Sequence, residues 1–307
     1  MTINRLAPHR FTLRQLQYVV AVADRLSFHK AADVCNVSQP SLSVQIAQLE
    51  AALGVQLFER NRRRVLVTDA GRDVLERARR LLVEADDLRE SSASLGDPLA
   101  RTLRVGVIPT ISPYLLPAVT PEVRAAYPKL TLTWIEDKTE VLVRSLDVGS
   151  LDAALLALEA DVGDLDHEPI ARDAFVLATP RDHPLGGKAS AAKAAELRGA
   201  PVLLLDDGHC FREQALAFCS NAKARELEFR ATSLSTLAQM VAGGAGVTLL
   251  PELAVPTESR RAEIAIRRFA KPAPHRTVAL VWRKRSPLGA ALRRLAGTVR
   301  SAYPGRS

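Results

Sequence analysis

The chain has 307 residues, of which 47% are hydrophobic and 25% are charged. This length and composition are typical of a soluble globular protein with two or more domains, each with its own core. The N-terminus lacks the apolar core of a signal peptide, and no apolar run is long enough to cross a bilayer. We therefore expect a cytoplasmic protein with no membrane partner, in which thiols are kept reduced.

The positive charge is concentrated near the N-terminus. The whole chain has a net charge of +8, and residues 1–72 carry ten Lys and Arg against five Asp and Glu. Residues 73–98 are acidic, with four Lys and Arg against seven Asp and Glu. The densest basic run is RNRRR, from Arg60 to Arg64. A local basic patch favours a polyanionic partner, and the alternative is a patch that only increases solubility.

Three helices are predicted in the N-terminal segment. Residues 12–24 place apolar side chains on one helical face after Thr12, a suitable N-cap. A second short helix fits residues 27–37, and a third fits 38–54 with Pro40 in its first turn. The third helix has an apolar stripe at helical spacing: Leu42, Ile46, Leu49 and Leu53. Two short helices joined by a tight turn are typical of a helix-turn-helix, whose second helix enters the major groove of DNA.

The next segment predicts a β-hairpin. Residues 55–68, VQLFERNRRRVLVT, alternate well enough for two strands, with the arginines at the tip. Such a hairpin could lie as a wing against DNA phosphates. Solvated polar side chains are the alternative for each feature alone, but the helix pair, the polar helix start and the arginine hairpin together favour DNA binding.

Residues 28–71, FHKAADVCNVSQPSLSVQIAQLEAALGVQLFERNRRRVLVTDAG, closely resemble the LysR-type transcriptional regulators. The resemblance implies a winged helix-turn-helix domain over residues 1–70 that binds a double-stranded DNA operator. It assigns DNA contacts to the start of the recognition helix and to the wing: Ser38, Gln39, Pro40, Ser41, Ser43, Arg60 and Arg63. Many family members carry an arginine where this chain has Val44, so no base or phosphate contact is expected there.

A long helix is predicted after the hairpin. It begins at Thr68, a candidate N-cap, and ends before Gly96 and Pro98. One face follows a heptad pattern: Val74, Ala78, Leu81, Ala85, Leu88, Ser92 and Leu95. The pattern and the resemblance favour a dimerisation linker over residues 71–98, which would present two recognition helices to two half-sites. Packing of this helix on its own domain is the alternative.

The remaining chain alternates short apolar runs with helical stretches, which predicts an α/β fold of βαβ units on mostly parallel sheets. The predicted strands are residues 102–108, 130–135, 152–158, 174–179, 201–205, 228–232, 246–251 and 276–282. The predicted helices include residues 113–127, 139–149 and 233–244. Ligands of such folds bind near the carboxyl ends of the strands.

The resemblance to the LysR family implies a regulatory domain over residues 99–307 like that of periplasmic binding proteins. It would have two Rossmann-like lobes with an effector cleft between them. Lobe I would comprise about 99–173 and 276–307, and lobe II about 174–275. We place the two crossings between lobes near Ala171–Phe175 and Lys271–Thr277.

Two of the three cysteines lie in DGHCFREQALAFC, Asp207 to Cys219. The third, Cys35, has apolar neighbours in the second helix, so we expect a buried structural thiol. The spacing of Cys210 and Cys219 matches no common zinc site, and a hydrolytic cysteine usually has a base distant in sequence. Inert buried thiols and a redox pair remain as alternatives.

Helix geometry constrains the redox alternative. Nine helical steps of ~1.5 Å would place the two Cα atoms roughly 13 Å apart, whereas a disulfide needs about 4.4 to 6.8 Å. Disulfide formation would therefore require the segment to refold, as a conformational switch does. We expect Cys210, near a helix N-terminus with His209 and Arg212 nearby, to attack first and Cys219 to resolve.

The segment LLLDDGHCFREQALAFC, with residues 228–256 and 275–288, resembles the hydrogen-peroxide-sensing members of the LysR family. The resemblance implies that peroxide oxidises Cys210 to sulfenic acid and that Cys219 closes an intramolecular disulfide. The residues predicted to bind or activate peroxide are Thr110, Thr139, Asp207, Gly208, His209, Arg212 and Arg276.

The same resemblance implies a regulator of peroxide-defence genes that acts as a dimer of dimers, with RNA polymerase and a thiol reductant system as further partners. It implies no cofactor, no metal and no enzymatic activity. One alternative is a LysR-type regulator that binds a small organic effector in the interlobe cleft. A thiol peroxidase would fit the cysteines but would leave the DNA-binding segment and the heptad helix unexplained.

Overall fold

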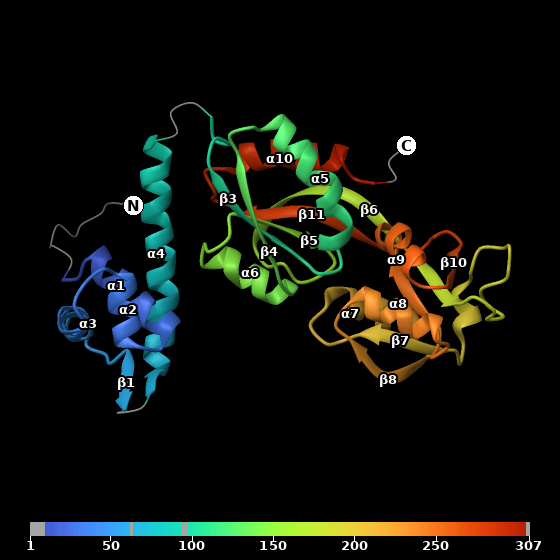
Figure 1. Ribbon diagram of the computed structural model, residues 1–307, viewed down its shortest axis with the longest axis horizontal. Coiled ribbons are helices and arrows are strands. Elements are labelled where there is room, and N and C mark those ends of the chain that lie inside the picture. Colours follow the sequence, from blue (N-terminus) through green and yellow to red (C-terminus); the bar gives the residue numbers. More distant parts are fainter. Residues whose placement is uncertain (1–9, 62–63, 94–96, 305–307) are drawn as a thin grey trace. The chain divides into compact units, whose positions relative to one another are not determined.

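The computed structural model describes residues 10–61, 64–93 and 97–304, and the chain divides into two compact units (Figure 1). Unit 1 comprises residues 1–96 with 147–150, and unit 2 comprises 97–146 with 151–307. Within the described ranges, no helix is long and apolar enough to cross a membrane.

Unit 1 begins with the three predicted helices, and their caps are confirmed. They are α1 (Leu13–Arg25), α2 (Phe28–Val34) and α3 (Gln39–Leu53). The side chain of Thr12 accepts a hydrogen bond from the Gln15 amide in a capping box, and Ser38 caps α3. Gly54 ends α3 with a φ of 72°, a left-handed conformation that favours glycine.

The core of unit 1 forms around the inner face of α3. Leu42, Ile46 and Leu49 are fully buried there, as the apolar stripe predicted. Cys35 is the C-cap of α2 and packs against the core of unit 1, but it is half-buried and not buried as expected. Burial nevertheless raises the pKa of Cys35.

The predicted hairpin and long helix complete unit 1. The strands β1 (Phe58–Asn61) and β2 (Arg64–Val67) pair antiparallel, and α4 (Asp69–Ala93) follows. Early in α4, Ala78 is buried in the unit's own core, whereas Leu81 and Leu88 further along are exposed. The first part of α4 therefore packs on its own unit, and Leu81 and Leu88 lie on its exposed side. Leu95 and the side chain of Ser92, both in the predicted heptad, lie outside the described residues.

Unit 2 is built on a seven-stranded sheet in the order β10-β6-β11-β5-β3-β4, with β9 also paired to β6. These strands are β3 (Thr102–Val107), β4 (Thr131–Glu136), β5 (Ala153–Ala157), β6 (Leu165–Pro180), β9 (Thr248–Pro251), β10 (Ile264–Arg268) and β11 (His275–Arg283). A second, two-stranded sheet contains β7 (Pro201–Leu205) and β8 (Arg225–Ala231), which run parallel.

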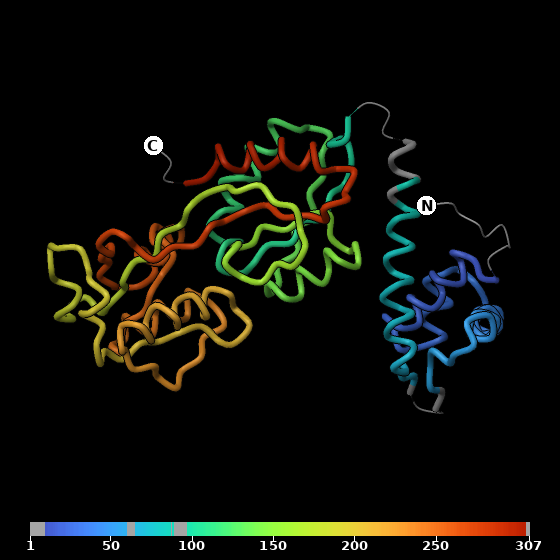
Figure 2. The backbone as a smooth tube through the Cα atoms, turned by 180° about the vertical axis from the view of Figure 1, so that it is seen from behind, coloured from blue at the N-terminus to red at the C-terminus, as the bar shows by residue number. Residues whose placement is uncertain are grey.

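The expectation of mostly parallel sheets is wrong. Parallel pairing is present in β3–β4, β3–β5 and β7–β8, but β6 pairs antiparallel with β9, β10 and β11, and β11 pairs antiparallel with β5. The long strands β6 and β11 lie side by side in both views (Figures 1 and 2). Because the chain runs out along β6 and returns along β11, the two strands have opposite directions. Their pairing includes Asp173 opposite Arg276, within both predicted crossings.

Helices cover the sheets of unit 2. They are α5 (Ser112–Ala126), α6 (Thr139–Asp147), α7 (Cys210–Asn221), α8 (Leu234–Ala242), α9 (Val255–Arg261) and α10 (Gly289–Ser301). Short 3₁₀ turns, η1 (Ala194–Leu197) and η2 (Glu252–Ala254), precede β7 and α9. Both α7 and α8 pack against β7, and α10 packs against α5 and β6 (Figure 1).

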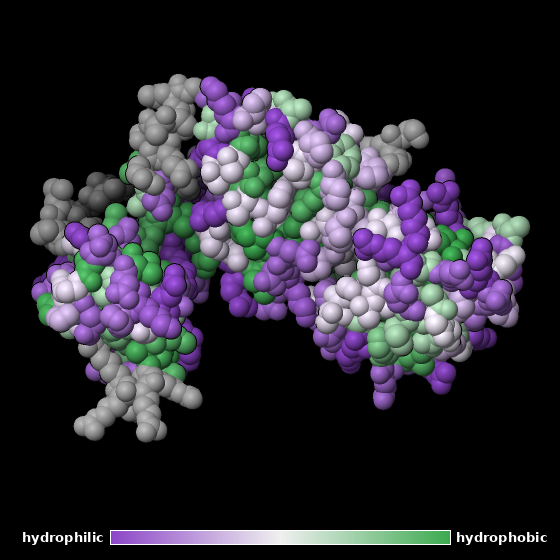
Figure 3. Space-filling view, in the orientation of Figure 1, coloured by the Kyte–Doolittle hydropathy of each residue, from purple (hydrophilic) through white to green (hydrophobic). Residues whose placement is uncertain are grey.

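The exposed strand β8 carries charged side chains along its length. Arg225, Glu226, Glu228 and Arg230 are all exposed. Figure 3 shows hydrophilic side chains along the lower rim of unit 2, where β8 lies. Charges on a strand of this kind oppose edge-to-edge pairing with other chains.

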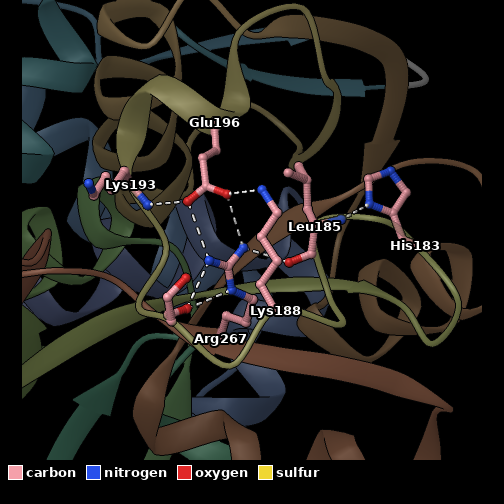
Figure 4. A network of polar contacts seen from close by, with 7 residues as sticks. His183, Leu185, Lys188, Lys193, Glu196 and Arg267 are labelled. Carbon is pink, nitrogen blue, oxygen red and sulfur yellow. Dashed lines mark hydrogen bonds and ion pairs between the residues drawn. The ribbon is translucent and has the colours of Figure 1, made fainter.

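The excursion between β6 and β7 is held by one buried arginine (Figure 4). The Arg267 guanidinium donates to the carbonyl of Leu185 at 2.6 Å, to that of Ser190 at 2.8 Å and to the Glu196 carboxylate. Lys188 donates to Glu196 at 2.6 Å. The Lys188 hydrogen bond, the Lys193 amide and Arg267 lower the pKa of Glu196 to about 2. This network ties the segment between β6 and β7 to β10.

Candidate functional site

Three strand-to-helix turns of unit 2 converge on a small cavity. It is lined by residues 108–110 after β3, residues 138–139 after β4 and residues 208–210 after β7. These are the carboxyl ends of parallel-paired strands, where α/β folds bind ligands. The structure thus brings together Thr110, Thr139, Gly208, His209 and Cys210, which the sequence predicted as site residues.

Cys210 is the first residue of α7 and a free thiol, only 7% exposed. His209 occupies the N-cap position and makes no capping hydrogen bond through its side chain. The first amides of a helix have no intrahelical acceptors, so the helix N-terminus stabilises nearby negative charge. Cys210 therefore occupies a position that favours a reactive sulfur.

Thr110 is oriented by the fully buried Arg276. The guanidinium donates to Thr110 Oγ1 at 2.7 Å and to the Thr110 carbonyl at 3.0 Å. Its Nε donates to Asp173 Oδ2 at 2.9 Å, and both partners of this ion pair are buried. Because Thr110 Oγ1 accepts from Arg276, its own hydroxyl proton is left to donate elsewhere. Arg276 thus acts on the cavity through Thr110.

Thr139 has a buried hydroxyl with no hydrogen-bond partner among the residues that the structure describes. It begins α6, is 7% exposed and lines the same cavity as Cys210. A buried hydroxyl without a partner costs about 1–3 kcal/mol. This hydroxyl therefore has hydrogen-bonding capacity that no described protein group uses.

The surroundings of His209 favour its neutral form. Burial lowers the pKa of His209, the Lys138 ammonium lowers it further, and Asp206 opposes them. A neutral imidazole can donate and accept a hydrogen bond, so His209 remains suited to orient a bound molecule.

Arg212 and Asp207, which the sequence also predicted as site residues, are not among the residues that line the cavity. The Arg212 guanidinium donates to Asp207 and Glu226, each at 2.8 Å, and to the Leu205 carbonyl. Hydrogen bonds from Arg230 and Arg212 hold the pKa of Asp207 below its usual value. A nearly buried guanidinium needs carboxylate partners, which here draw it away from Cys210.

Cys219 lies on the same helix and in a different environment. It is 4% exposed, and burial together with the Glu226 charge raises its pKa to about 12. Both thiols are free, and α7 is continuous between them. Nine helical steps correspond to roughly 13 Å between the Cα atoms, so the predicted separation of the thiols by secondary structure is confirmed. Among the described residues, no cluster of three metal-ligating side chains is present.

Lys138 lines this cavity, and Asp173 supports it through its bond with Arg276. Neither residue was predicted from the sequence. Lys138 directly precedes the predicted Thr139, which was the only available signal. Asp173 lies in a predicted crossing, but nothing in the sequence pairs it with Arg276.

The start of α3 presents polar side chains to solvent. Gln39, Pro40 and Ser41 are exposed, and Gln39 donates to the half-buried Ser43 at 2.9 Å. The Ser38 hydroxyl accepts from the Ser41 amide and so caps the helix. Of the predicted wing contacts, Arg63 and the side chain of Arg60 lie outside the described residues.

Comparison with known families and structures identifies the class. The family "Bacterial regulatory helix-turn-helix protein, lysR family" matches residues 13–72, and the "LysR substrate binding domain" matches residues 96–304. The chain therefore belongs to the LysR family of DNA-binding transcriptional regulators. Its fold is a winged helix-turn-helix followed by a regulatory domain like that of periplasmic binding proteins.

Whole-chain relatives narrow the assignment. The chain is 44% identical to a Pectobacterium carotovorum "Hydrogen peroxide-inducible genes activator", covering 95% of this chain and 97% of the relative. It is 43% identical to the Escherichia coli "DNA-binding transcriptional dual regulator OxyR", covering 95% and 96%. A full-length Pseudomonas aeruginosa OxyR variant matches with a TM-score of 0.79 at 37% identity, covering 95% of this chain and 96% of that one. A hydrogen-peroxide-bound mutant of Corynebacterium glutamicum OxyR matches with a TM-score of 0.65 at 34% identity. The match covers 96% of this chain and 95% of that one. The chain is an OxyR-type regulator.

Proposed function

We propose that hydrogen peroxide switches this regulator by linking Cys210 to Cys219, and that the switch controls peroxide-defence genes. One observation carries the proposal: a thiol at a helix N-terminus shares a small cavity with a buried, unpartnered hydroxyl, that of Thr139. The small size of the cavity favours peroxide over an organic effector. The peroxide-bound relative supports the same assignment.

The chemistry balances without a cofactor. The Cys210 thiolate attacks one peroxide oxygen, the O–O bond breaks, and the departing hydroxide takes a proton to leave as water. Cys210 is then a sulfenic acid, oxidised by two electrons. The Cys219 thiolate attacks that sulfur and displaces its hydroxyl as a second water, which leaves a disulfide. A cellular thiol reductant would restore both thiols.

The cavity residues would hold the oxidant during attack. Thr110, with its hydroxyl oxygen bonded to Arg276, has a proton to donate to peroxide, and Thr139 has a hydroxyl without another partner. His209, neutral and largely buried, would accept or donate the remaining hydrogen bond. Donors aimed at the leaving oxygen stabilise the charge that develops there.

Disulfide closure requires α7 to open. The two Cα atoms must approach by several ångströms, and Cys219 must leave an environment that keeps it protonated. The contacts of Arg212 with Asp207 and Glu226 hold the first turn of α7 in its helical state and would have to break. The refolded segment would then present a different surface to other subunits.

We propose the following assembly for the output. Residues 1–70 would bind the operator, with Ser38, Gln39, Pro40, Ser41 and Ser43 at the groove and Arg60 and Arg63 at phosphates. Residues 71–98 would dimerise through exposed leucines such as Leu81 and Leu88, and residues 99–307 would sense peroxide. The protein would act in the cytoplasm as a dimer of dimers and contact RNA polymerase.

Peptide mapping after one equivalent of peroxide tests this function. The proposal expects a peptide pair joined through Cys210 and Cys219, and no linkage in a Cys210→Ser chain. A protein whose two thiols stay unlinked, or a Cys210→Ser protein that still changes its operator footprint with peroxide, would contradict it.

A further inference from the structure

Lys138 connects two of the turns that form the cavity. It lies between β4 and α6, directly before Thr139, and is half-buried. Its ammonium donates to the carbonyl of Asp207 at 2.7 Å. Asp207 belongs to the other turn, between β7 and α7, which leads into Cys210. One lysine side chain therefore ties the turn that carries Thr139 to the turn that carries the reacting thiol.

The shape of the β7–α7 turn matches this lysine. Gly208 has a φ of 85°, a conformation that favours glycine. A Cβ at Gly208 would lie 3.1 Å from Lys138 Cδ and 3.3 Å from Nζ. The lysine stem thus packs directly over the bare backbone of Gly208, and the absence of a side chain there gives Lys138 its access to the Asp207 carbonyl.

The charge of Lys138 also acts within the cavity. Lys138 is the cation that, together with burial, lowers the pKa of His209, and Asp206 is the facing carboxylate that opposes it. Arg212, the other cation near Cys210 in the sequence, is bonded to carboxylates outside the cavity. Lys138 therefore places a positive charge in the cavity wall close to the N-terminus of α7.

We infer that Lys138 is a positioning residue of the peroxide reaction, which holds the Asp207–Gly208 turn so that Cys210 faces Thr110 and Thr139. This inference rests on the proposed peroxide function. Lys138 acts through the turn that it binds and through its charge, and it takes no part in bond making. Without it, the turn would lose its contact with the β4–α6 turn, and His209 would be protonated more readily.

A graded series of variants separates the hydrogen bond from the charge. Lys138→Arg keeps both, Lys138→Gln keeps a donor without the charge, and Lys138→Met keeps only the apolar stem. Each is made with Cys219→Ser, so that oxidation stops at the Cys210 sulfenic acid. The rate of sulfenic acid formation with one equivalent of peroxide is followed by trapping with a cyclic 1,3-dione and mass measurement. The matched control is Lys129→Met, an exposed lysine just before β4.

The expected result is a rate about tenfold lower for Lys138→Met, equivalent to one charge-assisted hydrogen bond. Lys138→Gln should fall between, and Lys138→Arg and Lys129→Met should stay within about twofold of the parent. NMR titration of the imidazole should show a higher pKa of His209 in Lys138→Met and Lys138→Gln only. A lysine that only stabilised the fold would not give this difference between the variant that loses the charge and the variant that loses both the charge and the donor.

Two results would overturn the inference: a Lys138→Met rate within about twofold of the parent, or an unchanged pKa of His209 in that variant. If Lys138→Met fails to fold, Lys138→Gln decides by the same two measurements. If the Cys219→Ser parent itself forms no sulfenic acid, the peroxide function fails. The His209 titration and hydrogen exchange of the Gly208 amide then test the placement of Lys138 separately.

Discussion

The two ends of helix α7 place the same side chain in opposite environments. At the N-terminal end, Cys210 shares its cavity with the hydroxyls of Thr110 and Thr139 and with the ammonium of Lys138. At the other end, Cys219 is buried beside Phe218, whose ring packs against Phe269 at 5.0 Å. Burial, and in second place the charge of Glu226, raise the pKa of Cys219 and keep its thiol protonated. The two cysteines therefore differ in their surroundings and not in residue type, and the proposed order of reaction rests on that difference.

The same comparison explains why the switch has to be conformational. A resolving thiol that shared the polar cavity could react at once, without movement of the backbone. Cys219 is instead buried in the apolar core, so in the proposed mechanism its reaction depends on opening α7. The energy that holds α7 closed therefore determines how readily an initial oxidation becomes a lasting disulfide.

Exchange of each cysteine gives the largest expected effect. Cys210→Ser should abolish oxidation by one equivalent of peroxide, because Cys219 remains buried and protonated. Cys219→Ser should oxidise at an undiminished rate and stop at sulfenic acid. Intact-mass measurement with dione trapping distinguishes the two. Oxidation of Cys219 in the Cys210→Ser chain at the parent rate would contradict the assigned order.

Arg276→Met should have the next largest effect, on stability. The change leaves the buried Asp173 carboxylate without its partner, which costs about 3–5 kcal/mol. Urea denaturation of the full chain measures the loss. The exposed pair of Arg144 and Glu140 provides the control, because Arg144→Met should cost less than about 1 kcal/mol. Equal losses in the two variants would show that burial of the Arg276 pair is unimportant.

Thr139→Val should separate function from stability. Valine has the same shape and removes a buried hydroxyl that has no partner in the described structure. We expect unchanged or higher stability, by up to about 1 kcal/mol, and sulfenic acid formation about tenfold slower because one peroxide donor is lost. Thr110→Val is the matched comparison, and it should also lose stability because Arg276 loses its acceptor. A Thr139→Val chain that reacts at the parent rate would remove Thr139 from the site.

Glu196→Gln should have the smallest effect, on stability alone, because Glu196 lies in η1, which contacts α7 but does not line the cavity. The native pKa of Glu196 is about 2, below the value of about 4.3 in an unfolded chain. Its contribution to stability is therefore present above about pH 4.3 and is lost as the pH falls toward 2. Thermal unfolding should show a difference between parent and variant at pH 6 that shrinks by pH 3, with the peroxide rate unchanged. A difference that grew on acidification would contradict the assigned pKa.

Local signals in the sequence predicted the helices well. Thr12, Ser27 and Ser38 cap helices as expected, and Gly54 ends one, because caps depend on a few neighbouring residues. The start of α7 at Cys210 was likewise predicted within its turn. The β-hairpin followed from alternation over a short range.

The antiparallel strands could not be predicted in the same way. The first half of β6 carries Asp166, His167 and Glu168 and is partly exposed. Because these residues are polar, the sequence pattern did not predict a strand there. The direction of β6 relative to β11 depends on a return of the chain nearly a hundred residues later. Pairing of distant strands is a tertiary property that local pattern does not contain.

The charged residues of the site were the hardest to place. Arg212 is close to Cys210 in sequence, yet Glu226 and Asp207 draw its guanidinium away. Lys138 is 72 positions from Cys210 and is nevertheless in the same cavity. The partners of a long cationic side chain depend on the fold, so sequence proximity did not predict the carboxylate partners of Arg212 and did not indicate Lys138.

Hydrogen exchange of the α7 amides, before and after one equivalent of peroxide, tests the central claim most directly. Mass measurement of a peptide spanning residues 205–224 reports the exchange and the Cys210–Cys219 disulfide in the same sample. The account predicts that α7 is protected in the reduced chain and loses that protection as the disulfide forms. A disulfide that forms while α7 keeps its protection would contradict the conclusion that the helix must open.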